Sequence, residues 1–272
     1  MPDGPKPSEL TTAVTNQLRA MTGGEPSVRT LTQSLRLLAK WRSQVIANTL
    51  RKRDAPIVGH GPFTGMIYDT RASEGGYVPR RLGCYEASLA PVIEEIVARD
   101  YPLILDIGAA EGYYAIGLAL RMPKARIIAR DSDPKARALC ADLAAANGVA
   151  DRIEIGAEID HGGLSVLGTG RSLVLCDIEG GEDALLDPAA APDLASADIL
   201  VEVHDSMVPN LSSRLSERFA ATHHVTRIDR ALDSAALPDW AEELSDLDRL
   251  LMLWEWRAGP TPWLWMQSLK HR

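Results

Sequence analysis

The segment LILDIGAAEGYYAIGLAL, residues 103–120, decides the fold because it joins an apolar strand, a glycine turn and an apolar helix. The strand ends at Asp106, and the turn runs through Gly108 and Gly112. In α/β proteins such a unit places a ligand at the carboxyl end of the strand, against the first turn of the helix. The segment therefore predicts a nucleotide-type site on an α/β sheet.

The glycine spacing distinguishes between nucleotides. A dinucleotide fingerprint, G-x-G-x-x-G, would need glycines two and five positions after Gly108, where the chain has Ala110 and Tyr113. The remaining D-x-G-x-x-x-G spacing suits S-adenosylmethionine (SAM), whose amino-acid tail replaces the pyrophosphate. Asp106 can hold the tail ammonium while the loop amides face its carboxylate, and Gly112 lets the helix start close to the sheet. The alternative is a tight turn without a ligand.

A second acidic residue supports an adenosine ligand. Strand RIIAR (126–130) is followed by Asp131, which can accept two hydrogen bonds from a ribose diol. Asp133 is better placed as the N-cap of the next helix. The third strand ends before Ala157 and Glu158, where adenine contacts are expected.

The chain divides into three parts. Residues 1–55 predict a helical extension, with helices at about 8–21 and 26–53, and residues 56–86 predict a lobe of short strands and loops. From 87 to 272, helices alternate with short apolar strands, which predicts a doubly wound, mostly parallel sheet with helices on both faces. Near the C-terminus, residues 250–266 read as a tryptophan-rich hairpin that packs in the core or lines a substrate pocket.

Composition excludes several classes of protein. The chain has no long apolar run and no leader pattern, so we expect no membrane span and a cytoplasmic location. Its three cysteines form no C-x-x-C pair, which argues for reduced thiols. The net charge of -8 makes a nucleic-acid partner a weak expectation.

The N-terminal extension differs in charge from the rest. Residues 1–55 hold nine Lys and Arg against four Asp and Glu, and the second helix is amphipathic. We expect its apolar face, which includes Leu31, Leu35 and Leu50, to cover the main domain or a second copy in a homodimer. Membrane-surface or RNA binding is the alternative.

Several short motifs in order then point to a family: GPFTGMIY (61–68), LGCYE (82–86), DIGAAEGYY (106–114), ARDSDP (129–134), NGV (147–149), CDIEGGE (176–182) and VEVHD (201–205). With them the sequence resembles class I SAM-dependent methyltransferases of the FkbM type, over about residues 60–205. The resemblance implies strand order 3-2-1-4-5-7-6 and oxygen-directed methyl transfer that leaves S-adenosylhomocysteine (SAH). FkbM-type proteins usually carry Asn where this chain has Ala110, and Glu where it has Asp131.

Motifs and resemblance together predict the site residues. The residues expected to bind the cofactor are Asp106, Gly108, Ala109, Glu111, Gly112, Tyr113, Asp131, Ser132, Ala157, Glu158, Asp177 and Tyr85. Tyr85 and Glu86 resemble the family's Y-E pair, which would close over the cofactor.

The acceptor chemistry is expected at the ends of the fourth and fifth strands. His204 is the expected general base because its ordinary pKa lies near neutrality, and Asp177 would orient the acceptor or take its proton. Glu182 would serve a helix dipole, whereas Glu179 could face the acceptor. A divalent cation on Asp177, His204 and Asp205 is a less favoured alternative, because one imidazole makes a poor Mg²⁺ ligand set.

The function predicted from these residues is methylation of a small-molecule hydroxyl. The basic N-terminal helix alone supports an RNA or protein methyltransferase instead, and a non-catalytic SAM-binding protein is a third hypothesis. Nothing in the sequence names the acceptor.

Overall fold

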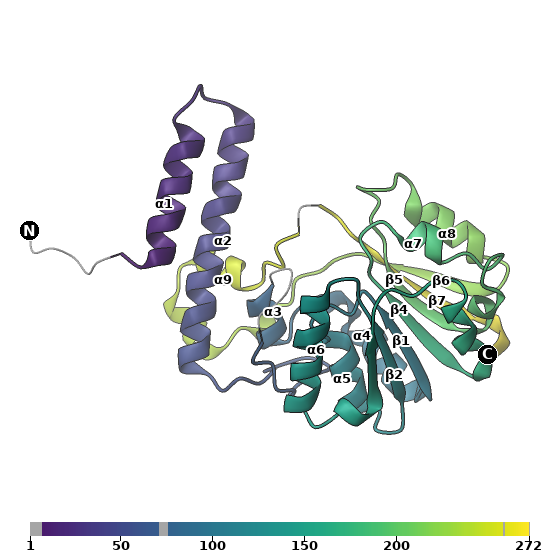
Figure 1. The fold of residues 1–272 in the computed structure, drawn as a ribbon. Helices are drawn as coiled ribbons and strands as arrows, with labels where there is room; N and C mark the ends of the chain where they lie inside the picture. Colours follow the sequence, from purple (N-terminus) through teal and green to yellow (C-terminus); the bar gives the residue numbers. More distant parts are fainter. Residues whose placement is uncertain (1–6, 71–75, 258, 272) are drawn as a thin grey trace, which may run out of the picture.

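A mixed sheet forms the centre of the protein in a computed structural model that describes residues 7–70, 76–257 and 259–271 (Figure 1). Within these residues the sheet has seven strands in the order β3-β2-β1-β4-β5-β7-β6, as the resemblance implied. Only β7 runs antiparallel to its neighbours. The strands are β1 (Leu103–Ile107), β2 (Arg126–Arg130), β3 (Ile153–Gly156), β4 (Ser172–Cys176), β5 (Asp198–Glu202), β6 (His223–Ile228) and β7 (Trp263–Ser268).

Side chains of the central strands alternate between two cores, one on each face of the sheet. Along β1, Ile104 joins one buried cluster, while Leu103 and Leu105 join the other. Because both faces are covered, β1 is apolar at nearly every position instead of alternating with polar residues. The main covering helices are α4 (Ala90–Arg99), α5 (Tyr113–Arg121), α6 (Pro134–Ala146), α7 (Glu182–Leu185) and α8 (Leu211–Phe219).

The N-terminal helices α1 (Glu9–Thr22) and α2 (Val28–Arg53) form a hairpin that projects from the body (Figure 1). Its outer half and its inner half behave differently. Leu50, in the inner half of α2, is buried in the same core as the sheet, whereas Leu31 and Leu35 are 66% and 69% exposed. The apolar face expected to cover the domain therefore does so over its C-terminal half alone.

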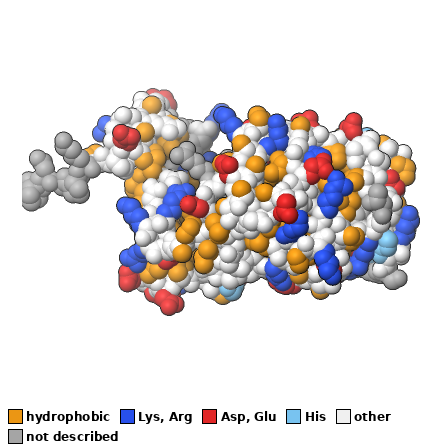
Figure 2. All heavy atoms as spheres, turned by 60° about the horizontal axis from the view of Figure 1, so that its bottom comes forward, with side chains coloured by type: hydrophobic (Ala, Val, Ile, Leu, Met, Phe, Trp, Pro, Cys, Tyr) orange, Lys and Arg blue, Asp and Glu red, His pale blue; other side chains and the backbone are white. Residues whose placement is uncertain are grey.

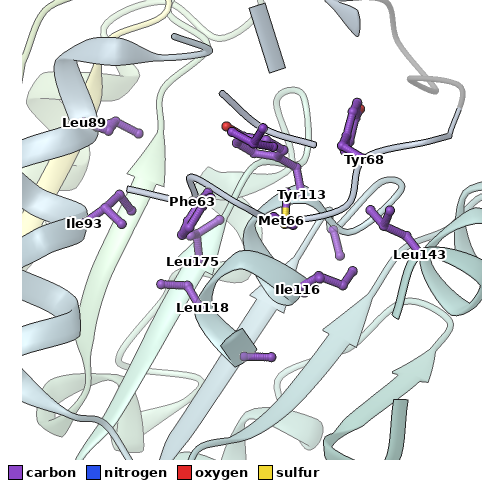
Figure 3. Close-up of a cluster of buried hydrophobic side chains, with 14 of the residues drawn as sticks. Phe63, Met66, Tyr68, Leu89, Ile93, Tyr113, Ile116, Leu118, Leu143 and Leu175 are labelled. Atoms are coloured by element: carbon purple, nitrogen blue, oxygen red, sulfur yellow. The ribbon is translucent and has the colours of Figure 1, made fainter. Parts of the chain in front are cut away.

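The segment before α4 is part of the core rather than a separate layer. Phe63, Met66 and Tyr68 pack around Tyr113 and Ile116 of α5 (Figure 3). This segment was expected to hold short strands and loops, but it contains α3 (Tyr77–Leu82), and an isolated bridge is its only described strand-like pairing. Left-handed glycines at both ends of α3 confine it to six residues.

The predicted C-terminal hairpin is wrong. Its first three residues, 250–252, end α9 (Asp246–Met252), which Ser245 caps by accepting a hydrogen bond from the Asp248 amide, and its last four belong to β7. β7 inserts between β5 and β6, so its partners come from the sheet instead of the adjacent chain. Trp263 and Trp265 are buried, which confirms the core interpretation for these two tryptophans.

Two surface observations bear on partners. No helix of the described residues is long and apolar enough to cross a bilayer. On the face drawn in Figure 2, Lys and Arg side chains are interspersed with Asp and Glu and form no continuous basic patch.

Candidate functional site

A cavity of about 660 Å³ opens at the carboxyl ends of β1, β2 and β4. Strand order reverses between β1 and β4, and open α/β sheets bind ligands in the crevice at that point. A larger hollow of about 1030 Å³ lies between α2, α3 and α6, but it carries none of the predicted site residues. The cavity at the strand ends is therefore the candidate site.

Most of the expected cofactor residues line this cavity, namely Tyr85, Asp106, Gly108, Ala109, Glu111, Tyr113, Asp131, Ser132, Glu158 and Asp177. Gly112 and Ala157 do not line it. Gly112 begins α5 with φ +91, and a Cβ there would lie 2.3 Å from Ile116 and 2.7 Å from Cys140. Gly112 therefore serves close packing of the helix, and Ala157 is an exposed residue outside the lining.

The loop after β1 is held against β4. Gly108 has φ +82, and a Cβ on it would stand 1.6 Å from the Asp177 carbonyl oxygen, so no other residue fits there. The amides of Gly108 and Ala109 both donate to the Arg130 carbonyl, and the Ala110 amide donates to Asp131. These three amides therefore already have partners within the protein, and the expectation that loop amides face a ligand carboxylate stays a prediction.

Asp106 is the polar group in the cavity that most needs a ligand. It is 1% exposed, and neither of its carboxylate oxygens makes a hydrogen bond of normal geometry to a described residue. Burial raises the pKa of Asp106 to about 7, although the nearby Ala115 amide opposes this shift. A buried carboxyl without donors is costly, and a ligand ammonium would satisfy it.

Asp131 is oriented by the backbone. Its two oxygens accept hydrogen bonds from the Ala110 amide and the Asp133 amide, each at 2.8 Å. Each carboxylate oxygen has a second lone pair, so the group can still accept from two ribose hydroxyls. Asp133 caps α6 by accepting from the Lys135 amide at 2.9 Å, as predicted.

Arg80 is a cavity residue that sequence reasoning missed. It is 5% exposed, and its guanidinium carbon lies 4.0 Å from the centre of the Tyr85 ring. Its Nε lies 3.3 Å from Glu111, which also accepts a hydrogen bond from the Tyr68 hydroxyl at 2.6 Å. The neighbouring motif L-G-C-Y-E drew attention to Tyr85, but only the fold shows that α3 brings a buried cation to the cavity.

At the other end of the cavity, Asp177 and His204 are neighbours, but only Asp177 lines the wall. His204 is 5% exposed and lies behind Asp177, with 3.7 Å between His204 Nε2 and Asp177 Oδ1. Burial lowers the pKa of His204, but the hydrogen bond to Glu182 and the charges of Glu202 and Glu179 outweigh it, so the pKa is raised. His204 was expected to contact the acceptor directly. Instead, Asp177 lines the cavity and His204 lies behind it.

The acidic residues near His204 have different hydrogen-bond partners and different exposure. Asp205 accepts from the amide and the hydroxyl of Ser212 at the start of α8, so it does not join Asp177 and His204 as the metal alternative required. Donor atoms of Asp177, Glu182 and His204 do lie within 4.8 Å of one another. Glu179 is exposed on the cavity wall, where it can face an acceptor as expected.

Glu86 differs from its expected position over the cofactor. It is buried, bonded to Tyr114, and paired with Arg257, which also pairs with Glu202 and Glu255. Burial and the charge of Glu202 raise the pKa of Glu86 to about 8, although Arg257 lowers it. Of the Y-E pair, Tyr85 lines the cavity and Glu86 belongs to a buried ionic network.

The strand order defines a Rossmann-like α/β fold, and the cavity at its switch point is where such folds bind ligands. No protein-family model matches the sequence. Over 117 residues the chain is 32% identical to the release factor glutamine methyltransferase of Cereibacter sphaeroides. That match covers 43% of this chain and 39% of that enzyme, so the chain matches well under half of its length.

Three solved structures that align with the chain are methyltransferases or hold a cofactor. They are the O-methyltransferase from Bacillus cereus in complex with SAH (12% identity, TM-score 0.41), cofactor-bound Rv0187 from MTB (15%, 0.43) and the O-methyltransferase TomG from Streptomyces achromogenes in complex with SAM (15%, 0.43). The alignments cover 94%, 97% and 94% of this chain and 96%, 98% and 96% of those chains. At these values the fold assignment depends on the strand order itself.

Proposed function

We propose that this chain is a SAM-dependent methyltransferase that methylates a hydroxyl group of a small molecule. The observation that carries the proposal is the pair of carboxylates at the switch point of the sheet. Asp106, buried and without a hydrogen bond of normal geometry, and Asp131, oriented by two amides, stand at the ends of adjacent strands. The motif resemblance to FkbM-type proteins supports oxygen as the methylated atom.

The described side chains fit each part of the cofactor. Asp106 would hold the ammonium of the amino-acid tail, and Arg80 its carboxylate, because the loop amides are already bonded. Asp131 would accept from the ribose hydroxyls, while Ser132 and Glu158 line the adenine end. Bound SAM would supply a methyl group already activated on a sulfonium, so the protein's task is chiefly alignment.

Asp177 and His204 would manage the proton of the acceptor. Asp177, on the cavity wall, would accept a hydrogen bond from the acceptor hydroxyl and orient its oxygen. As the oxygen takes the methyl group, its proton would pass through Asp177 to Nε2 of His204, 3.7 Å away. This route requires His204 to be neutral before transfer.

Calorimetry with SAM, SAH and NAD tests the cofactor assignment. We expect SAM and SAH to bind and NAD not to bind. Asp131→Ala should weaken SAM binding about 10- to 100-fold, since a hydrogen bond to a charged group contributes about 1.5–3 kcal/mol. Asp133→Ala is the matched control, because it removes a carboxylate that caps α6 and leaves the ribose contact intact.

Binding of NAD without SAM would overturn the proposal. Tight SAM binding without methyl transfer to any hydroxyl compound would support the non-catalytic alternative instead.

A further inference from the structure

We propose that Glu182 is a positioning residue that holds His204 as the Nδ1–H tautomer, so that Nε2 is the nitrogen available to take the acceptor proton. This inference rests on the proposed function for its catalytic meaning, but its geometry is independent of the reaction. Glu182 Oε1 lies 2.8 Å from His204 Nδ1, and both side chains are buried. The sequence alone indicated only a helix-dipole role for Glu182.

The backbone fixes the carboxylate of Glu182 from the opposite side. Its Oε2 accepts from the Gly180 amide at 2.9 Å, and its Oε1 accepts from the Ile178 amide at 3.3 Å. These two amides belong to the turn between β4 and α7, which also carries Glu179 with φ +49. The turn therefore aims the carboxylate at the imidazole before any ligand binds.

The protonation states follow from these partners. Burial raises the pKa of Glu182, but the His204 hydrogen bond and the backbone amides outweigh this effect and lower it, so the group is a carboxylate at neutral pH. A carboxylate can only accept hydrogen bonds, so Nδ1 must carry a proton. The lone pair of the neutral ring is therefore on Nε2, which lies 3.7 Å from both Asp177 and Glu202.

The same geometry argues against Glu182 as a metal ligand. Its two oxygens already accept three N–H groups, two from the backbone and one from His204. Oε2 keeps one lone pair, but a cation bound through Oε1 or through Nδ1 of His204 would displace the bond that orients the imidazole. Positioning is thus the role that leaves every existing contact in place.

The charges around His204 predict its titration. Asp177 and Glu179 face the ring from the segment after β4, Glu182 from α7, and Glu202 from β5, while Arg257 neutralises part of the Glu202 charge. All four carboxylates favour the imidazolium. The neutral, proton-accepting ring therefore forms at higher pH than in an unperturbed histidine, and Glu182 is the carboxylate that bonds directly to the ring.

The experiment is a ¹⁵N NMR titration of histidine side chains in the full chain, without acceptor. His204→Gln assigns the resonance among the six histidines. We expect wild-type His204 to show the Nδ1–H tautomer and a pKa above the ordinary value. In Glu182→Gln the pKa should fall by about one unit or more, because an opposite charge in hydrogen-bond contact is removed. Glu182→Asp should recover part of that shift.

Glu179→Gln is the matched control. It removes a neighbouring carboxylate that has charge but no hydrogen bond to His204, so the tautomer should stay Nδ1–H. The circular dichroism spectrum and the urea unfolding midpoint establish that each variant is folded. An Nε2–H tautomer in the folded wild type, or an unchanged His204 pKa in folded Glu182→Gln, would overturn the inference. Failure of the proposed function would show separately, as absence of SAM binding or methyl transfer with the tautomer unchanged.

Discussion

Ala110 adopts a left-handed backbone conformation, φ +48, in the turn between β1 and α5. A residue with a Cβ pays about 1–2 kcal/mol for this conformation, which glycine and asparagine tolerate better. In this conformation the Ala110 amide donates a hydrogen bond to Asp131 and so orients the Asp131 carboxylate. Asn, the residue that the resembled FkbM-type motif usually has at this position, would tolerate the conformation better than Ala.

Glycine substitutions at two adjacent alanines test this strain. We expect Ala110→Gly to leave the free energy of unfolding unchanged or raise it by up to about 1 kcal/mol, because relief of strain offsets the greater entropy of the unfolded chain. Ala109→Gly, at a position without positive φ, should lower it by about 0.5–1 kcal/mol. Urea titrations of both variants provide the comparison. Equal losses in both would show that Ala110 is not strained.

At the scale of the element, α2 has two different halves. Leu50 is buried against the core, whereas Val28, Leu31, Leu35 and Leu38 are exposed. These four positions follow the 3-4-3 spacing of a helix–helix seam. Thr32 and Ala39, which flank the seam, carry no charge to repel a second copy. We propose that the same hairpin of a second chain covers this exposed half.

One substitution in each half separates the two roles. Leu50→Ala should lower the free energy of unfolding by about 2–5 kcal/mol, the cost of a cavity in a packed core. Leu35→Glu should change the unfolding of the isolated chain by less than about 0.5 kcal/mol, because the site is exposed. It should, however, shift the sedimenting species from dimer to monomer. A monomeric wild type at tens of micromolar would contradict the second-copy proposal.

At the scale of the whole molecule, Arg257 ties distant parts of the chain together. Its guanidinium pairs with Glu86 before α4, Glu202 at the end of β5 and Glu255 in the C-terminal segment. The three carboxylates are nearly inaccessible, so one cation compensates most of their charge, with Arg230 also pairing with Glu255. This network lies directly behind the Asp177 and His204 end of the cavity.

Removing this cation should destabilise the fold in a pH-dependent manner. We expect Arg257→Met to lower the free energy of unfolding at pH 8 by about 3–5 kcal/mol, because buried carboxylates lose their partner. At pH 5 the substitution should lower the free energy of unfolding by less. Glu86 has a folded-state pKa raised to about 8, so its stabilising contribution is complete below its ordinary pKa and is lost as pH rises through the raised one. Without Arg257 the pKa of Glu86 would be raised further.

Urea titrations at pH 5 and pH 8 measure the effect. Arg249→Met is the control, since Arg249 pairs with the exposed Glu242 and its loss should have little effect at either pH. An Arg257→Met loss that is equal at both pH values would show that the network does not control stability.

Much of the fold follows from local sequence. The strand β2, at residues 126–130, was predicted to the residue, because short apolar runs between polar turns leave few alternatives. Gly108 and Asp131 were also identified from spacing alone, although their contacts with Asp177 and Ala110 join different segments of the chain. The strand order came with the resemblance rather than with any periodicity.

Contacts between distant segments required the tertiary structure. Arg80 reaches the cavity because α3 is buried, and β7 pairs with β5 on one side and β6 on the other. The sequence by itself determined most of the parallel strands and their turns, because these conformations depend on near neighbours, and it singled out Asp106 and Asp131 as candidate ligand carboxylates. Only the tertiary structure decided that His204 stands behind Asp177 with Glu182 against its Nδ1, because burial and ion pairing depend on residues that meet only after the chain folds.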